Sequence, residues 1–335
     1  MTPGVYLTVD VECSMGGAWG DPSRHPVPPS RAIWGQFGGQ KLGIPMIVEI
    51  LRQHGLAGTF FVEPFVDEQG YPGQMQGVCE YLLDAGQDVQ LHIHPNHLHY
   101  GRKQAGQDAP FTDAIADLPP EAQREMIAEG ASRLARWTGR RPVAFRAGNM
   151  GASEQTLECL SAVGIPIDSS YCFVFAGGQC RFPAAEPYNG SKLYGDVLEL
   201  ALSGMHQLRL PGLRPAKVLD PVGVSFGECR EIIRRLHARG VDAAAILHSF
   251  SLMKVRNVQY EGGRPNRLVT GRFRRLCRWL GDSADIHPTR TFSWLAEELA
   301  AGRYEPKAAA PGRLNRPVRA VARKLMQVGN SIYWT

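Results

Sequence analysis

Short apolar runs alternate along this chain with longer segments of helical periodicity, and this alternation constrains the fold more than any other feature. Repeated strand–helix–strand units produce a parallel sheet that is joined by right-handed crossovers. The expected strands are the runs Val5–Val11, 58–62, 88–94, 143–146, 165–168 and 243–248. The expected helices are the segments 43–54, 75–85, 120–138, 153–163, 226–239, 272–280 and 293–300.

The number of these units indicates how the sheet is organised. About seven of them in one chain favour an α/β fold with a closed or nearly closed sheet, a distorted (β/α) barrel, over two separate domains. The 335 residues are enough for either arrangement. We therefore expect a barrel domain over residues 1–304 and a basic tail over residues 305–335.

Composition narrows the possible classes of protein. A hydrophobic fraction of 44% and a charged fraction of 21% are typical of a soluble globular chain. The sequence contains no apolar run of about 18 residues, the length that would span a bilayer, and its start lacks the features of a secretory signal. Its seven cysteines include no CxxC pair, which favours reduced thiols and a cytoplasmic location.

The positive charge of the chain is concentrated at its end. After Glu305 there is no acidic residue, and the basic residues there are Lys307, Arg313, Arg316, Arg319, Arg323 and Lys324. Since the whole chain carries a net charge of only +5, the part before this tail is close to neutral. We therefore expect no nucleic-acid partner for the barrel.

Three stretches lack a regular pattern, namely 13–40, which holds Trp19 and Trp34, 178–196 and 256–270. Long irregular segments in a compact domain are usually functional or mobile. We interpret them as walls of a substrate cleft, and plain surface loops are the alternative.

Polar residues stand at the ends of several expected strands. In a barrel of parallel strands, functional residues gather at the carboxyl ends of the strands. Polar groups placed there on apolar strands are costly unless they are paired or used. The residues at these positions are Asp10, Glu12, His92, His94, Arg146, Asp168 and His248.

His92 and His94 lie two residues apart on one expected strand, so their side chains point to the same side. Two imidazoles from one strand are a suitable pair of metal ligands. The alternative is a histidine-rich loop without a metal, because His97 and His99 follow.

Asp10 and Glu12 also share one side of a strand, and a cation or a proton would relieve their repulsion. A carboxylate pair and two histidines at the same edge of a sheet together predict a metal centre. Two histidines and one carboxylate leave coordination positions open for water and substrate, as in catalytic sites.

Arg146 and His248 each follow an apolar strand. For Arg146 we expect a buried partner, most simply Asp10, whereas a surface cation is the alternative. For His248 we expect a catalytic role because the other polar residues stand at the same strand ends, whereas a hydrogen-bonded core histidine is the alternative.

The chain resembles the NodB-type polysaccharide deacetylase family over roughly residues 4–300, because five motifs occur in the family's order. They are Thr8-Val9-Asp10-Val11-Glu12, His92-Ile93-His94-Pro95, Phe145-Arg146-Ala147-Gly148, Ile167-Asp168-Ser169-Ser170-Tyr171 and Leu247-His248. The segment 43–62 also resembles the family's first helix and second strand. The resemblance implies a NodB-like fold and a hydrolase that cleaves amide bonds.

The resemblance also implies roles for single residues. Asp10 would be the general base, oriented by Arg146, and His248 would be the general acid, tuned or held by Asp168. The implied ligands of a divalent metal, which we expect to be zinc, are Glu12, His92 and His94.

Two departures from the family's pattern leave assignments open. The usual motif has two adjacent aspartates, whereas here Val11 separates Asp10 from Glu12, so these two acids could exchange roles. The usual histidine ligands are spaced four apart, whereas His92 is followed by Asn96 at that spacing, so His97 could replace His94. The pattern is nearest to the Asp-Val-Glu branch, which includes enzymes of surface-polysaccharide assembly and aminoarabinose-lipid deformylases.

The expected reaction is removal of an acyl group, N-acetyl before others, from an acylamino sugar in polysaccharide or glycolipid biosynthesis. One alternative is a catalytically silent, carbohydrate-binding relative, and another is an amide hydrolase that acts on a small molecule other than a sugar. The presence of Arg146 and His248 favours an enzyme, because a binding module needs neither an oriented base nor an acid.

The tail carries one apolar stripe at helical spacing, made of Leu314, Val318, Val321, Leu325 and Val328. Basic residues flank it, and Ile332, Tyr333 and Trp334 follow. Such a helix either packs its stripe on the barrel or lies on an anionic membrane surface. The second interpretation would suit a lipid-linked sugar substrate and a peripheral membrane location.

Overall fold

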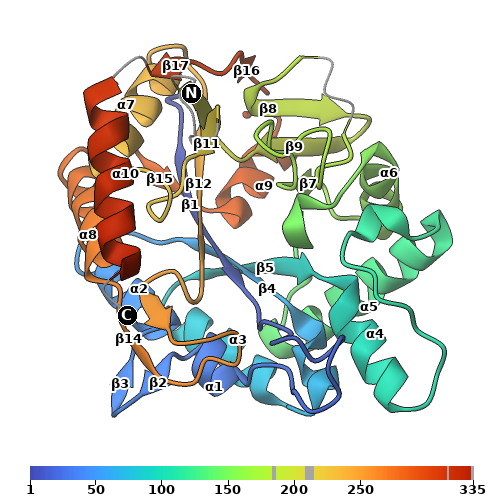
Figure 1. Ribbon diagram of the computed structural model, residues 1–335. Helices are drawn as coiled ribbons and strands as arrows, with labels where there is room; N and C mark the ends of the chain where they lie inside the picture. The colour runs from blue at the N-terminus through green and yellow to red at the C-terminus, as the bar shows by residue number, and fades with distance from the viewer. Residues whose placement is uncertain (183–185, 208–214, 315–316, 333–335) are drawn as a thin grey trace.

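A curled, mostly parallel sheet forms the centre of the molecule in the computed structural model, which describes residues 1–182, 186–207, 215–314 and 317–332 (Figure 1). The order of its strands is β12 (Ala243–His248), β1 (Val5–Val11), β4 (Thr59–Val62), β5 (Asp88–Ile93), β6 (Ala144–Ala147), β7 (Ile167–Asp168), β9 (Val197–Ala201), β8 (Asn189–Tyr194) and β16 (Ala308–Ala309). A further strand, β15 (Thr289–Arg290), pairs with the start of β1.

Every neighbouring pair from β12 to β9 is parallel, which gives seven parallel strands. The last two strands, β8 and β16, run antiparallel to their neighbours and complete one edge. The expectation of an α/β fold with a distorted, NodB-like barrel of about seven parallel strands is therefore confirmed. All seven residues of β1 are buried, so this strand lies in the middle of the hydrophobic core.

The helices expected from periodicity are also present. They are α2 (Ile44–Arg52), α3 (Gln74–Asp84), α5 (Pro120–Thr138), α6 (Glu154–Val163), α7 (Phe226–His237), α8 (Arg267–Asp282) and α9 (Phe292–Ala300). Two of them begin earlier than predicted because polar residues cap them. The side chain of Asn266 accepts from the amide of Val269 at the start of α8, and that of Thr291 accepts from Trp294 at the start of α9.

The stretches that lack a pattern in the sequence contain short elements. Residues 13–40 include α1 (Pro29–Ala32) and β2 (Gln36–Phe37), which pairs with β3 (Gln40–Lys41), and residues 256–270 include β14 (Gly263–Pro265), which pairs with β13 (Met253–Val255). Further elements lack a clear signal in the sequence. They are α4 (Pro95–Gln104), β10 (Gly204–Gln207), β11 (Ala216–Val218), β17 (Arg313–Leu314), and the 3-10 turns η1 (Pro64–Gln69), η2 (Ile115–Asp117) and η3 (Gly148–Met150).

The tail forms the predicted helix, α10 (Pro317–Ile332), but its apolar stripe does not pack on the barrel. Val321, Leu325 and Val328 are exposed, whereas Arg323 is buried against the side chains of Glu228 and Gln207. The packing interpretation is therefore wrong for these residues, because the buried ion pair turns the polar face inward. Leu314 is buried in β17, before the helix.

Some of the tail predictions lie outside the described part of the chain. These concern Arg316, Tyr333 and Trp334, and the side chains of Val318, Arg319 and Ile332. Among the helices that are described, none has the length and hydropathy needed to cross a membrane.

Candidate active site

The residues predicted at the strand ends meet at one edge of the sheet. The parallel register places Asp10 beside His248 and His92 beside Arg146. A cavity of about 180 Å³ opens there. Its lining residues are Asp10, Glu12, His92, His94, Asn149, Met150, Phe175, Gln179, Leu202, Val218, Asp220, Ile246 and His248. Six of the seven predicted site residues therefore lie in or next to this pocket, because Arg146 contacts Asp10 directly.

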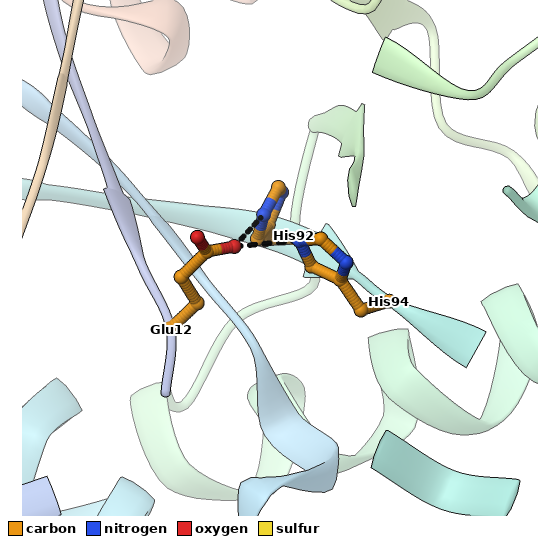
Figure 2. Close-up of side chains that lie close together, drawn as sticks. All are labelled: Glu12, His92 and His94. Carbon is orange, nitrogen blue, oxygen red and sulfur yellow. Dashed lines mark hydrogen bonds and ion pairs between the residues drawn. The ribbon is translucent and has the colours of Figure 1, made fainter. Parts of the chain in front are cut away.

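Glu12, His92 and His94 converge on one point (Figure 2). The Oε2 atom of Glu12 lies 3.0 Å from Nε2 of His92 and 2.6 Å from Nε2 of His94. Burial alone would raise the pKa of Glu12, but the two imidazoles lower it well below its usual range. One carboxylate and two imidazole donors lie within 4.8 Å of one another, which fits a divalent metal such as zinc.

The second ring nitrogen of each histidine has its own partner. Nδ1 of His92 lies 2.8 Å from the carbonyl oxygen of Arg146, and Nδ1 of His94 lies 2.7 Å from Oδ1 of Asp113. Such contacts fix the orientation and tautomer of a metal-binding histidine. Both Nε2 atoms are thereby directed at Glu12.

Asp113 is a site residue that the sequence gave no reason to select. It lies in the loop after α4, and the side-chain amides of Asn96 and Asn149 both donate to it. Asn96 stands where the NodB-type motif has its second histidine. In this chain Asn96 instead donates to Asp113, which contacts His94.

The turn after β6 is shaped around His94. A Cβ atom on Gly148 would lie 2.3 to 2.5 Å from atoms of the His94 ring, so this position has no space for a side chain. The next two residues, Asn149 and Met150, have φ values of 52° and 58°, which are uncommon for residues other than glycine. Strained backbone of this kind clusters at functional sites.

His97, the alternative ligand, is not a member of the Glu12–His92–His94 group. It is buried, and its Nδ1 atom contacts the side-chain amide of Gln69. Burial and the neighbouring His94 lower the pKa of His97 well below its usual range. Among the described residues, the group with metal-ligand spacing contains His94 and not His97.

Arg146 binds Asp10, as the sequence suggested. Its Nη1 atom donates to Oδ1 of Asp10 at 2.6 Å and to the hydroxyl of Thr8 at 2.8 Å. The rest of the guanidinium donates to the carbonyl and hydroxyl oxygens of Ser169 and stacks on Phe61. Both members of this ion pair are fully buried, so Asp10 is held in one orientation.

His248 faces Glu12 from the other wall of the pocket, with Nε2 at 3.8 Å from Oε1. It is more exposed than the other two histidines of the pocket, and its ring stacks on Phe250. Asp220 lines the same cavity. Burial raises the pKa of Asp220 to about 6, although the nearby His248 acts in the opposite direction.

Asp168 lies apart from this pocket. Its carboxylate accepts from the hydroxyl of Ser170 at 2.7 Å and from the amide of Ser170 at 3.1 Å. It adjoins the buried Glu199, whose pKa burial and Asp168 raise well above the usual value. Asp220 therefore shares the cavity with His248, together with Asp10 and Glu12, whereas Asp168 does not line it.

Glu63, like Asp113 and Asp220, is a site residue that was not predicted. It follows β4, and its carboxylate accepts from the backbone amides of Phe65 and His94. Burial raises the pKa of Glu63 to about 7, against the influence of His92 and His94. Because Glu63 directly follows β4, the search for polar residues at strand ends could have found it.

No model of a known protein family matches this sequence, and neither does any curated protein. Solved structures do match. A protein from Mycobacterium smegmatis that is assigned as a polysaccharide deacetylase aligns with a TM-score of 0.55 at 17% identity, over 93% of this chain and 95% of that one.

Two further matches have lower scores. A pseudoenzyme of carbohydrate esterase family 4 from Bacillus anthracis gives a TM-score of 0.45 at 13% identity, over 89% of this chain and 66% of that one. A family 4 carbohydrate esterase from Streptomyces lividans, in complex with acetate, gives 0.42 at 13% identity, over 84% and 88%. The resemblance to NodB-type deacetylases is thus confirmed at the level of the fold, which this chain shares with the Mycobacterium smegmatis protein.

Proposed function

We propose that this protein is a metal-dependent hydrolase that removes an acyl group, most simply N-acetyl, from an amino sugar. The observation that carries the proposal is the pocket itself. It combines a Glu–His–His donor group, a carboxylate fixed by an arginine and a partly exposed histidine on the opposite wall. The fold shared with a protein assigned as a polysaccharide deacetylase supports the same reaction.

Glu12, His92 and His94 are the proposed ligands. Glu12 is preferred over Asp10 because it is the carboxylate that meets both imidazoles. A divalent ion held there, zinc in our proposal, supplies Lewis acidity that activates water and polarises the acyl carbonyl. The donor group leaves room for water and substrate because it has three members and borders the cavity.

Asp10 and His248 divide the proton transfers. Asp10 accepts the proton of the attacking water, and Arg146 keeps its carboxylate oriented for that step. His248 gives a proton to the leaving amine, which an amide substrate requires because an amine anion is a very poor leaving group. In place of Asp168, we propose that Asp220 favours the protonated form of His248, since the two line one cavity.

The substrate that we propose is an acylamino sugar in polysaccharide or glycolipid biosynthesis, including surface polysaccharide assembly. Of the three segments that the sequence indicated as cleft walls, residues 178–196 contribute Gln179 to the described lining of the pocket, and the other two contribute no residue to it. The cysteines of the described residues are all free and buried, which supports a reducing compartment such as the cytoplasm. The proposal includes a lipid-linked form of this sugar as the substrate.

The test uses purified protein with an N-acetylated amino-sugar oligomer and an activated acetyl ester. Asp10→Asn should abolish turnover with the metal retained, whereas Glu12→Gln should first lose the metal. His248→Ala should slow the amide far more than the ester, because only the amide needs the proton. His25→Ala, at an exposed histidine outside the pocket lining, is the matched control and should change neither rate.

The same assay separates the two alternatives. Metal binding without turnover of any acylated sugar would indicate a silent carbohydrate-binding relative. Turnover restricted to acylated small molecules other than sugars would indicate an amide hydrolase of another class. Equal loss on amide and ester in His248→Ala would contradict the proposed role of that histidine.

A further inference from the structure

The helix α10 lies alongside α8 with its polar face turned toward the rest of the molecule (Figure 1). Arg323 contacts Glu228 and Gln207, and the side-chain amide of Gln327 donates to the backbone oxygen of Gly223 at 3.1 Å. One turn further, Asn330 donates to Asn266 at 3.2 Å. These inward residues follow one another at spacings of four and three, so they form one face of the helix.

The opposite face of α10 is apolar and exposed. The exposed fractions on this face are 46% for Val321, 66% for Leu325 and 41% for Val328, and Met326, on the flank of the helix beside Asn330, is 47% exposed. These are four of the ten large apolar side chains that are exposed in the described residues. A contiguous exposed apolar face on one helix, unlike scattered single residues, indicates a surface that contacts something else.

Basic residues border this apolar face. Lys324 is exposed on the helix itself. A groove beside the C-terminal half of α10 is lined by three cations and no acid among its residues, which are Lys254, Arg264, Pro265, Arg267, Leu268, Met326, Gly329 and Asn330. Met326 and Leu268 place apolar side chains directly next to the cations.

The groove is also close in the chain to the candidate active site. Lys254 lies in β13, which follows β12 and His248 after a short turn, and its amino group donates to the backbone oxygen of Asn330. The C-terminal end of α10 points toward the end of the molecule that holds the carboxyl end of β1 (Figure 1). A surface bound by α10 would therefore lie on a flank of the molecule that adjoins the strand carrying His248.

We propose that the exposed face of α10, together with the cationic groove beside it, docks on an anionic membrane surface. The apolar side chains enter the boundary between headgroups and acyl chains, and the cations meet the phosphate groups. Three cations that border apolar side chains match the phosphate groups of an anionic headgroup layer. The inference goes beyond the proposed deacylation and stands on surface residues alone.

The experiment is co-sedimentation of the full chain with vesicles of phosphatidylcholine, with or without phosphatidylglycerol, at low and high salt. We expect binding to the anionic vesicles only, and weaker binding at high salt because salt screens exposed charges. Leu325→Asp with Val328→Asp should reduce binding at least tenfold. Arg267→Gln with Lys324→Gln should reduce both the binding and its dependence on salt.

Leu193→Asp is the matched control, because Leu193 is 54% exposed on β8, away from α10. It should leave binding unchanged, and Leu325→Ser provides a milder variant should the double aspartate lower the melting temperature. Failure of the wild-type chain to bind anionic vesicles would overturn the proposal, as would equal losses in Leu325→Asp and Leu193→Asp. A dimer that Leu325→Asp dissociates without vesicles would instead assign this face to contact between copies.

Discussion

Among the described residues, Arg146 at the centre and Arg323 at the rim are both buried against carboxylates. Arg146 projects from β6 and contacts groups of β1 and of the residue after β7. Arg323 projects from the terminal helix and contacts Glu228 of α7 and Gln207 of β10. The two pairs have the same chemistry, but they differ in what surrounds them.

The difference shows how a buried ion pair acquires its role. Around Arg146 the neighbouring strands are fixed by the sheet, so neither Asp10 nor Arg146 can move to water if its partner is lost. Arg323 lies on a terminal helix outside the sheets, and Glu228 would keep the amide and hydroxyl of Ser225 as partners if that helix moved away. The central pair therefore orders a reacting group, whereas the rim pair orients a helix.

Arg146→Met should have the largest effect of the changes that we consider. It leaves the Asp10 carboxylate buried without its cation, which typically costs about 3 to 5 kcal/mol of unfolding free energy. Urea unfolding with the metal content held constant would measure the loss. Arg146→Met with Asp10→Asn should recover part of that stability, and a loss below about 1 kcal/mol in the single variant would contradict this account.

Asp220 sharpens the comparison because it is a partly buried carboxylate that accepts a hydrogen bond from the backbone amide of Val222. Its pKa is raised from 3.8 to about 6, so the native state favours the protonated form more than the unfolded state does. Its contribution to stability should therefore be complete below 3.8, fall as the pH rises to about 6, and stay low above that.

Asp220→Asn should remove this dependence on pH. Unfolding of both proteins at pH values below and above this window should show the variant gaining about 2 to 3 kcal/mol relative to wild type at the higher pH. A stability difference that does not change with pH would rule out the raised pKa.

Asp113 offers a smaller change next to the metal ligands. Loss of a carboxylate behind a metal-binding histidine typically weakens metal affinity by about 10- to 100-fold. Asp113→Asn should show this in a titration of zinc against a chelating dye. Asp117→Asn, in the neighbouring turn η2, is the control, and equal affinities in the two variants would show that Asp113 does not position His94.

Arg323→Met should have the smallest effect, about 1 kcal/mol, which corresponds to the net loss of ordinary hydrogen bonds. The effect of Arg323→Met should be easier to detect as faster proteolysis within α10, because the variant helix should detach more often. Lys324→Met changes the exposed neighbour and should leave the cleavage rate unaltered. If Arg323→Met lowered the free energy of unfolding as much as Arg146→Met does, the two buried ion pairs would not differ in the way that we describe.

Most of the sheet could be predicted from the sequence, because the runs that form β1, β4, β5 and β12 are short, apolar and separated by helical segments. The strand-end rule also predicted which residues converge. It could not predict Asp113 or Asp220, since both lie in loops whose paths depend on tertiary contacts. Asp168 was placed correctly at a strand end, but its neighbour Glu199 comes from β9, which gave no signal of its own.

The tail shows a different limit of sequence patterns. Periodicity correctly predicted a helix with one apolar stripe, and the usual rule turns such a stripe toward the core. The rule failed here because Arg323 can reach Glu228 only when the polar face is turned inward. Spacing identifies the faces of a helix, but the partners of its charged residues decide which face is buried.

The register of β1 and β12 has a consequence for how the protein is made. β1 ends at Val11, whereas the strand that covers its other edge and supplies His248 begins only at residue 243. Until that strand has been made, one edge of β1 is unpaired and largely apolar, the kind of segment that promotes aggregation of nascent chains. Pairing of two strands so far apart in the chain is slow, because the entropy of closing the intervening loop is lost before any stabilising contact forms. The pocket therefore cannot form before β12 has been made, and no fragment that ends before β12 can contain it.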